Sequence, residues 1–120
     1  MLKNILLIAL GGALGSLVRY LMSYFASLIG ASNELTILLV NIIGSFLIGL
    51  LIVFAGSKFY LFAAIGFCGG FTTFSTFSLQ TLQLFQSGQR IMAVFYVLAS
   101  VVMSILFVFL GMYLGQKMLK

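Results

Sequence analysis

Residues 66–78 read GFCGGFTTFSTFS, and they lie in the middle of the third of four long apolar segments. This stretch combines two adjacent glycines with a run of hydroxyl side chains, and both features weaken a helix. Inside a bilayer, an interrupted helix is tolerated only where protein or a water-filled cavity surrounds the freed backbone groups. The stretch therefore predicts a membrane helix that is broken near its middle.

A break of this kind exposes two sorts of polar group. The last carbonyls of the first half can bind a cation, and the first N–H groups of the second half can bind an anion. The alternative interpretation is a packing contact between glycines, in which the Ser and Thr hydroxyls bond to their own helix. The density of polar and small residues in the stretch favours a functional site.

The rest of the chain indicates a membrane protein. Of its 120 residues, 63% are hydrophobic and 6% are charged, whereas about 25% are charged in a typical globular domain. Crossing a bilayer takes about 20 apolar residues, and four segments qualify: 4–28, 35–55, 60–85 and 91–115. We predict a single domain over residues 1–120, an all-α bundle of four transmembrane helices that is surrounded by the lipid bilayer.

Small residues four positions apart predict close contacts between these helices, because they let backbones approach in lipid. Such pairs include Gly11 with Gly15, Gly66 with Gly70 and Gly111 with Gly115. A bundle of this size has little interior of its own, so a path for a polar solute would form between subunits. The sequence therefore predicts an oligomer.

The charged residues exclude several classes of function. The net charge of +5 comes from six cations that are scattered singly, so no basic patch for nucleic acid forms. One cysteine, Cys68, one carboxylate, Glu34, and no histidine leave no set of residues for a metal cluster, a catalytic triad or a paired-carboxylate mechanism. We expect neither an enzyme nor a nucleic-acid-binding protein.

Several uncharged side chains are candidates for contact with an anion. Phe74 and Phe77 are three residues apart, so they share a helix face, and the edges of their rings are electropositive. Asn41 can donate two hydrogen bonds through its amide, and Ser100 and Ser104 form a polar stripe on the fourth segment. The alternatives are ordinary packing for the phenylalanines and an interhelical hydrogen bond for the asparagine.

Arg19 lies within the first hydrophobic segment, about two-thirds of the way along it. Its side chain could extend to the membrane surface, as long cationic side chains commonly do. It could instead form a fixed positive charge that draws anions into a vestibule. The sequence leaves both interpretations open.

Three motifs together resemble the small bacterial fluoride channels called Fluc or CrcB. They are Gly11-Gly12-x-x-Gly15-x-x-x-Arg19, Asn41-x-x-Gly44 and the stretch 66–78. The resemblance covers the whole chain. It implies a fluoride-selective channel of the bacterial plasma (inner) membrane, which exports cytoplasmic fluoride passively through two pores at the interface of an antiparallel, dual-topology homodimer.

The resemblance also implies roles for individual residues. The residues that match the family's pore lining are Asn41, Phe74, Phe77, Ser75, Thr76, Ser100 and Ser104, and Arg19 matches its vestibule arginine. The backbone carbonyls of Gly69 and Thr72 match the ligands of a structural sodium ion at the dimer centre, and oxygen ligands suit such a hard cation. Some relatives have an acidic residue where this chain has Gln80, so no role of that acid is carried over.

Two other functions remain as alternatives. A small dual-topology antiporter needs a titratable group within the membrane, and the one carboxylate, Glu34, falls in a predicted loop. A non-transporting membrane assembly subunit would explain the small-residue faces without a pore. A measurement of ion flux would distinguish this subunit from a channel.

The distribution of cations bears on the orientation of the chain. With four spans, one end carries Lys3, Lys58, Lys117 and Lys120, and the other carries Arg90 and, if its side chain reaches the surface, Arg19. This imbalance favours cytoplasmic termini. The broken helix favours an antiparallel pair instead, because a two-fold axis in the membrane plane would bring carbonyls from both copies together around a cation.

Overall fold

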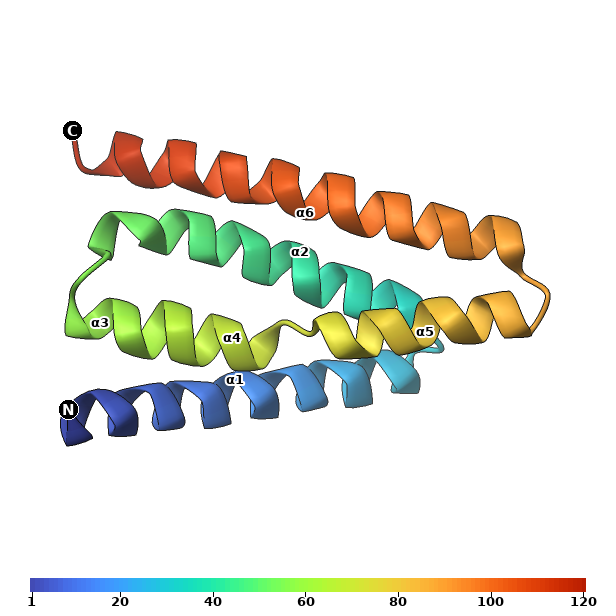
Figure 1. Ribbon diagram of the computed structural model, residues 1–120, viewed down its shortest axis with the longest axis horizontal. Coiled ribbons are helices and arrows are strands. Elements are labelled where there is room, and N and C mark those ends of the chain that lie inside the picture. The colour runs from blue at the N-terminus through green and yellow to red at the C-terminus, as the bar shows by residue number, and fades with distance from the viewer.

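The computed structural model describes residues 1–120 as an all-helical bundle with both termini at the same end (Figure 1). Four of its helical segments are long and apolar enough to cross a membrane. The first, second and fourth spans are α1 (Leu2–Leu28), α2 (Asn33–Leu51) with the short 3₁₀ turn η1 (Ile52–Phe54), and α6 (Arg90–Met118). The third span comprises α3 (Lys58–Tyr60), the π-helix η2 (Leu61–Cys68), α4 (Gly69–Phe71) and α5 (Phe74–Gln86). The predicted four-span architecture is confirmed, and each predicted segment begins and ends within one turn of these bounds.

Side-chain caps stabilise the starts of two helices that follow turns, α2 and α3, whereas α6 has no side-chain cap. The Ser32 hydroxyl accepts a hydrogen bond from the Leu35 N–H (3.1 Å) at the start of α2, and Ser57 does the same for Tyr60 (3.1 Å) at the start of α3. Such caps satisfy N–H groups that lack helical partners. The spans are joined by short connections.

The helices pack as two close pairs, α1 against the third span and α2 against α6 (Figure 1). A Cβ atom on Gly66 would lie 2.8 Å from the Ile8 carbonyl oxygen and 3.0 Å from Gly11 Cα. In the second pair, a Cβ on Gly115 would lie 2.7 Å from the Leu50 carbonyl oxygen. These distances leave no room for a side chain, so the predicted close contacts of small residues are confirmed.

The third span is broken at Thr72 and Thr73, which are extended with φ/ψ of −81°/158° and −150°/115°. The prediction of a helix that is interrupted within residues 66–78 is confirmed, and the break lies after the two adjacent glycines. Gly69 is helical, with φ −62° and ψ −39°, and α4 continues through both glycines to Phe71. Gly70 serves packing, because a Cβ there would collide with the backbone of Gly12.

Candidate functional site

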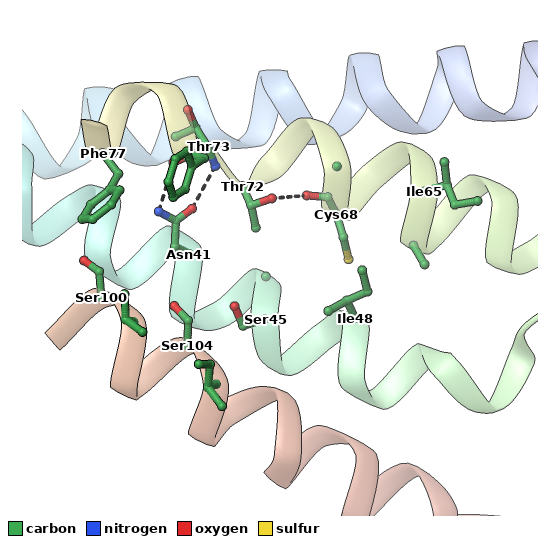
Figure 2. A pocket seen from close by; sticks show the side chains of 16 residues that line it. Asn41, Ser45, Ile48, Ile65, Cys68, Thr72, Thr73, Phe77, Ser100 and Ser104 are labelled. Carbon is green, nitrogen blue, oxygen red and sulfur yellow. Dashed lines mark hydrogen bonds between the residues drawn. The ribbon is translucent and has the colours of Figure 1, made fainter. Parts of the chain in front are cut away.

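A cavity of about 590 Å³ lies beside the break, between the third span, α2 and α6 (Figure 2). It gathers most of the residues that the sequence singled out for an ion pathway. These are Asn41, Gly69, Thr72, Phe74, Phe77, Ser100 and Ser104. Ser75 and Thr76 do not line this cavity.

Asn41 holds the break through two hydrogen bonds to one residue (Figure 2). Its Nδ2 donates to the Thr73 carbonyl oxygen (3.1 Å), and the Thr73 N–H donates to its Oδ1 (2.8 Å). One of the two N–H donors expected to serve an anion is therefore already used within the protein. The alternative interpretation, an interhelical hydrogen bond, is confirmed for this donor.

Thr73 is the N-cap of α5, a role that the sequence analysis missed although Thr is a common N-cap residue. Its hydroxyl accepts from the Thr76 N–H (3.1 Å), donates to the Thr76 hydroxyl (3.1 Å) and lies 3.2 Å from the Ser75 hydroxyl. Side chains thus satisfy the N–H groups of Thr73 and Thr76. The N–H groups of Phe74 and Ser75 remain at the positive end of α5, where an anion is favoured.

On the other side of the break, the carbonyls that end the first half of the span have different partners. The Cys68 carbonyl accepts from the Thr72 N–H (3.0 Å) and the Thr72 hydroxyl (2.8 Å). In an uninterrupted α-helix the Gly69 carbonyl would accept from the Thr73 N–H, but that N–H donates to Asn41. The Gly69 carbonyl therefore lacks its helical donor, which suits an oxygen that binds a cation.

Gly69 also faces outward from the chain. It is exposed, and nothing lies within 4 Å of the position that a Cβ would occupy. This region of the break is therefore open on a side that the chain itself does not cover.

Arg19 forms a hydrogen bond to α4, just before the break. Its Nε donates to the Gly70 carbonyl oxygen (3.3 Å), beside a longer bond from the Ser16 hydroxyl (3.4 Å). A second cavity, of about 300 Å³, is lined by Ser16, Arg19, Tyr20, Ser23, Ile37 and Thr76. Thr76 thus lies with Arg19 beside this second cavity, apart from the larger one.

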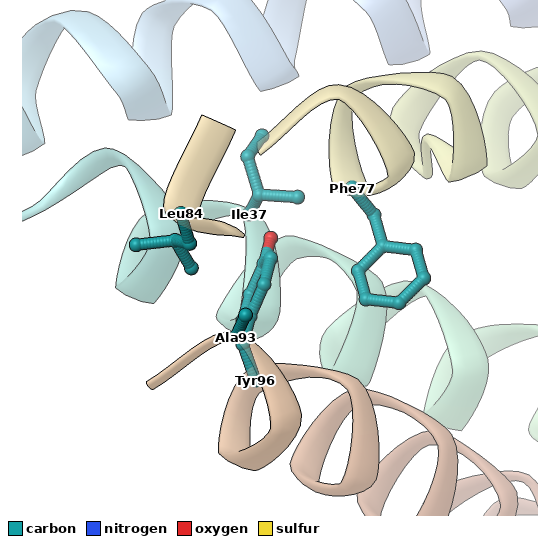
Figure 3. Packing of buried hydrophobic residues seen from close by; sticks show 5 residues of the cluster. All are labelled: Ile37, Phe77, Leu84, Ala93 and Tyr96. Carbon is teal, nitrogen blue, oxygen red and sulfur yellow. The ribbon is translucent and has the colours of Figure 1, made fainter. Parts of the chain in front are cut away.

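The two phenylalanines of the break have different surroundings. The Phe74 side chain is 79% exposed, whereas Phe77 is 8% exposed and belongs to a buried cluster with Ile37, Leu84, Ala93 and Tyr96 (Figure 3). The ring centroids of Phe74 and Phe77 are 5.5 Å apart, and Phe77 lies 5.2 Å from the Tyr96 ring. Phe77 therefore both lines the cavity and packs α5 against α6.

The polar stripe on α6 contains one hydroxyl without a partner. Ser100 is buried, and its Oγ makes no hydrogen bond within the chain. Tyr96, one turn earlier, donates its hydroxyl to the buried Gln80 Oε1. Since burying an unpaired hydroxyl costs free energy, the Ser100 hydroxyl in the cavity wall is available for a ligand.

Comparisons with known proteins agree on one family. Residues 6–112 match the family model described as "CrcB-like protein, Camphor Resistance (CrcB)". The chain is 48% identical to a protein of Leptospira interrogans, with 93% of this chain and 94% of the relative covered, and that protein is named "Fluoride-specific ion channel FluC". Proteins with the same name from Agrobacterium fabrum (46% identical, 96% and 98% covered) and Thermus thermophilus (44%, 94% and 94%) are also similar.

Proposed function

Because this chain belongs to the CrcB-like family and matches its channels along almost its whole length, it is a fluoride channel, and we propose that its pores form between two copies of the chain. It is a multi-pass membrane protein and not an enzyme. We place it in the plasma membrane of a bacterium, where it would export cytoplasmic fluoride and so confer resistance to it.

The observation that carries the proposal is a set of unpaired donors at the break and in the cavity wall. The Ser100 hydroxyl and the N–H groups of Phe74 and Ser75 have no partners within the chain. Fluoride is small and strongly hydrated, so a pathway must supply donors in place of water. We propose that these groups, together with the hydroxyl of Ser104 and the free N–H of Asn41, supply them.

The aromatic and hydroxyl residues complete the proposed pathway. The edges of the Phe74 and Phe77 rings would face the anion, and the hydroxyls of Ser75 and Thr76 would line the pathway where α5 begins. Arg19, fixed at the break, would raise the local concentration of anions in the vestibule.

A second copy of the chain accounts for the uncovered side of the cavity. Polar groups at the break would otherwise meet hydrocarbon, at a cost of several kcal/mol for each unsatisfied group. We propose that an inverted copy covers this side and completes two symmetric pores. The Gly69 carbonyls of the two copies, which lack their helical donors, would then bind one sodium ion at the dimer centre together with those of Thr72.

The test is ion efflux from liposomes that contain only this protein. Liposomes loaded with potassium fluoride or potassium chloride are diluted into salt of an impermeant anion, and valinomycin carries the compensating potassium. We expect rapid fluoride efflux and chloride efflux at the level of protein-free liposomes. Folded protein that releases neither anion would contradict the proposal and favour a non-transporting subunit.

A further inference from the structure

The amide of Asn41 and the backbone of Thr73 form a two-point contact between α2 and the break, which we call the Asn41 clamp (Figure 2). The contact joins residues 32 positions apart and uses both the N–H and the C=O of Thr73. In a continuous α-helix the Thr73 N–H would donate to the Gly69 carbonyl. The clamp therefore replaces the helical hydrogen bond from the Thr73 N–H to the Gly69 carbonyl.

The local sequence contains little else that would force the break. The chain has no proline, and no residue near the break has a positive φ. Threonine is allowed in α-helices, so neither Thr72 nor Thr73 excludes a helical backbone. The Thr73 cap supports the extended conformation locally, and among the tertiary contacts the Asn41 clamp is the one that binds the Thr73 N–H.

We infer that Asn41 is a positioning residue that holds the third span open at Thr72 and Thr73 and so keeps the Gly69 carbonyl free for a cation. The part concerning the cation rests on the proposed function, whereas the part concerning the backbone does not. Thr73 is 8% exposed, so its N–H and C=O have little access to solvent if the clamp is lost. Helix closure onto the Gly69 carbonyl would then satisfy the N–H within the chain.

The direct test is the backbone conformation of Thr72 and Thr73 in an Asn41→Leu variant, which removes both hydrogen bonds at nearly constant volume. Cα and Cβ chemical shifts of ¹³C-threonine-labelled protein report extended or helical backbone. We expect extended shifts in the wild type and helical shifts at both residues in Asn41→Leu. Asn33→Leu is the matched control, because Asn33 is exposed at the first turn of α2, and it should keep the wild-type shifts.

A second substitution makes the test specific for the break. Phe74→Pro places proline at the first position of α5, where it is favoured, and a proline there would clash with the Gly70 carbonyl in a continuous helix. Thr73 already has the extended backbone that a residue before proline prefers. We expect the double variant Asn41→Leu/Phe74→Pro to regain extended shifts.

Two results would overturn the inference. One is extended shifts at Thr72 and Thr73 in Asn41→Leu itself. The other is an Asn41→Leu protein that is no longer folded and that Phe74→Pro does not restore.

The cation part has its own measurement, which does not use ion flux. For the wild type, we expect a higher thermal unfolding midpoint in sodium chloride than in potassium chloride. This difference should be lost in Asn41→Leu and should return in the double variant. An undiminished sodium effect in Asn41→Leu would overturn the link between the clamp and the Gly69 carbonyl. A wild type without a sodium effect would refute the proposed sodium site, while the chemical shifts would still decide the role of Asn41 in the break.

Discussion

Phe74 and Phe77 are equivalent in the sequence pattern but not in the structure, since Phe74 is exposed and Phe77 is packed against Tyr96. We predict that Phe74→Ile lowers fluoride efflux severalfold with little change in thermal stability. Phe77→Ile should lower efflux and also destabilise the protein by about 1 kcal/mol or more, because it removes buried packing. Efflux and thermal unfolding at matched reconstitution levels measure the two effects.

Phe95→Ile is the control for both variants, since Phe95 is 70% exposed on α6 and does not line the cavity. It should leave efflux and stability unchanged. Wild-type efflux from Phe74→Ile and Phe77→Ile together would place the fluoride pathway elsewhere.

Most of the candidate residues could be predicted from the sequence, but their partners could not. Asn41 was recognised as a polar residue in an apolar helix, yet nothing in its neighbourhood indicates a bond to Thr73, which lies 32 positions away. The sequence does not show the position of the Arg19 side chain, because that position depends on a hydrogen bond to the Gly70 carbonyl of another helix. Local patterns indicate which groups are polar, whereas tertiary contacts decide which of them remain free.

Among the helices, the two adjacent glycines of α4 have different surroundings. A Cβ on Gly70 would collide with the Gly12 backbone in α1, whereas a Cβ on Gly69 would meet nothing in the same chain. Alanine is favoured over glycine in a helix by about 0.5–1 kcal/mol. We therefore predict that Gly70→Ala disrupts folding of the protomer, while Gly69→Ala leaves a folded protomer and weakens the dimer.

Subunit counting by single-molecule photobleaching in liposomes measures the dimer, and near-ultraviolet circular dichroism measures the folded protomer. A Gly69→Ala protein that dimerises as strongly as the wild type would show that the partner does not cover this side of α4.

The helical elements were predicted more completely than their irregularities. Long apolar segments indicate the four spans directly, and the glycine and hydroxyl motif indicates a break in the third. The motif does not indicate which of its residues leave the helix. Gly70 packs against α1 and both glycines are helical, and the extended residues are Thr72 and Thr73. The π-helix η2 has no comparable signature, because Leu61–Cys68 reads as ordinary apolar helix.

At the scale of the whole molecule, the one acidic side chain, Glu34, lies in the first turn of α2 and not in the predicted loop. Since the chain has no histidine, no acidic or imidazole side chain lies in the interior of a span, where it could couple fluoride movement to protons. We predict that transport is passive and independent of a proton gradient. In liposomes with the membrane potential clamped, an imposed pH gradient should leave internal fluoride unchanged. Uphill accumulation of fluoride under these conditions would indicate an antiporter.

The proposed inverted dimer requires both orientations of the chain in one membrane. The distribution of cations favours a single orientation, because four of them lie at the end that carries the termini: Lys3, Lys58, Lys117 and Lys120. At the other end lies Arg90, and Arg19 does not add to it because its side chain is bonded to Gly70. The exposed position of Gly69, which the chain itself does not cover, supports the inverted dimer. We predict that the contacts at the break outweigh the effect of the cations, so that both orientations occur in active protein.

Single cysteines in a Cys68→Ala background measure the orientation with an impermeant maleimide. Ala55→Cys and Ser87→Cys place exposed labels at opposite ends of the bundle, outside the spans. About half of each variant should react from outside intact cells. Complete labelling of one position and none of the other, in cells with active channels, would exclude the inverted dimer.

The position of both termini at one end of the bundle (Figure 1) limits how two copies could be joined into one polypeptide. A soluble linker from Lys120 to the next Met1 would start and finish on the same side of the membrane, so it would give two copies in the same orientation. A linker that itself crosses the bilayer once would reverse the second copy. A tandem gene that encodes an inverted pair therefore needs nine membrane crossings, that is, two sets of four and one connecting helix.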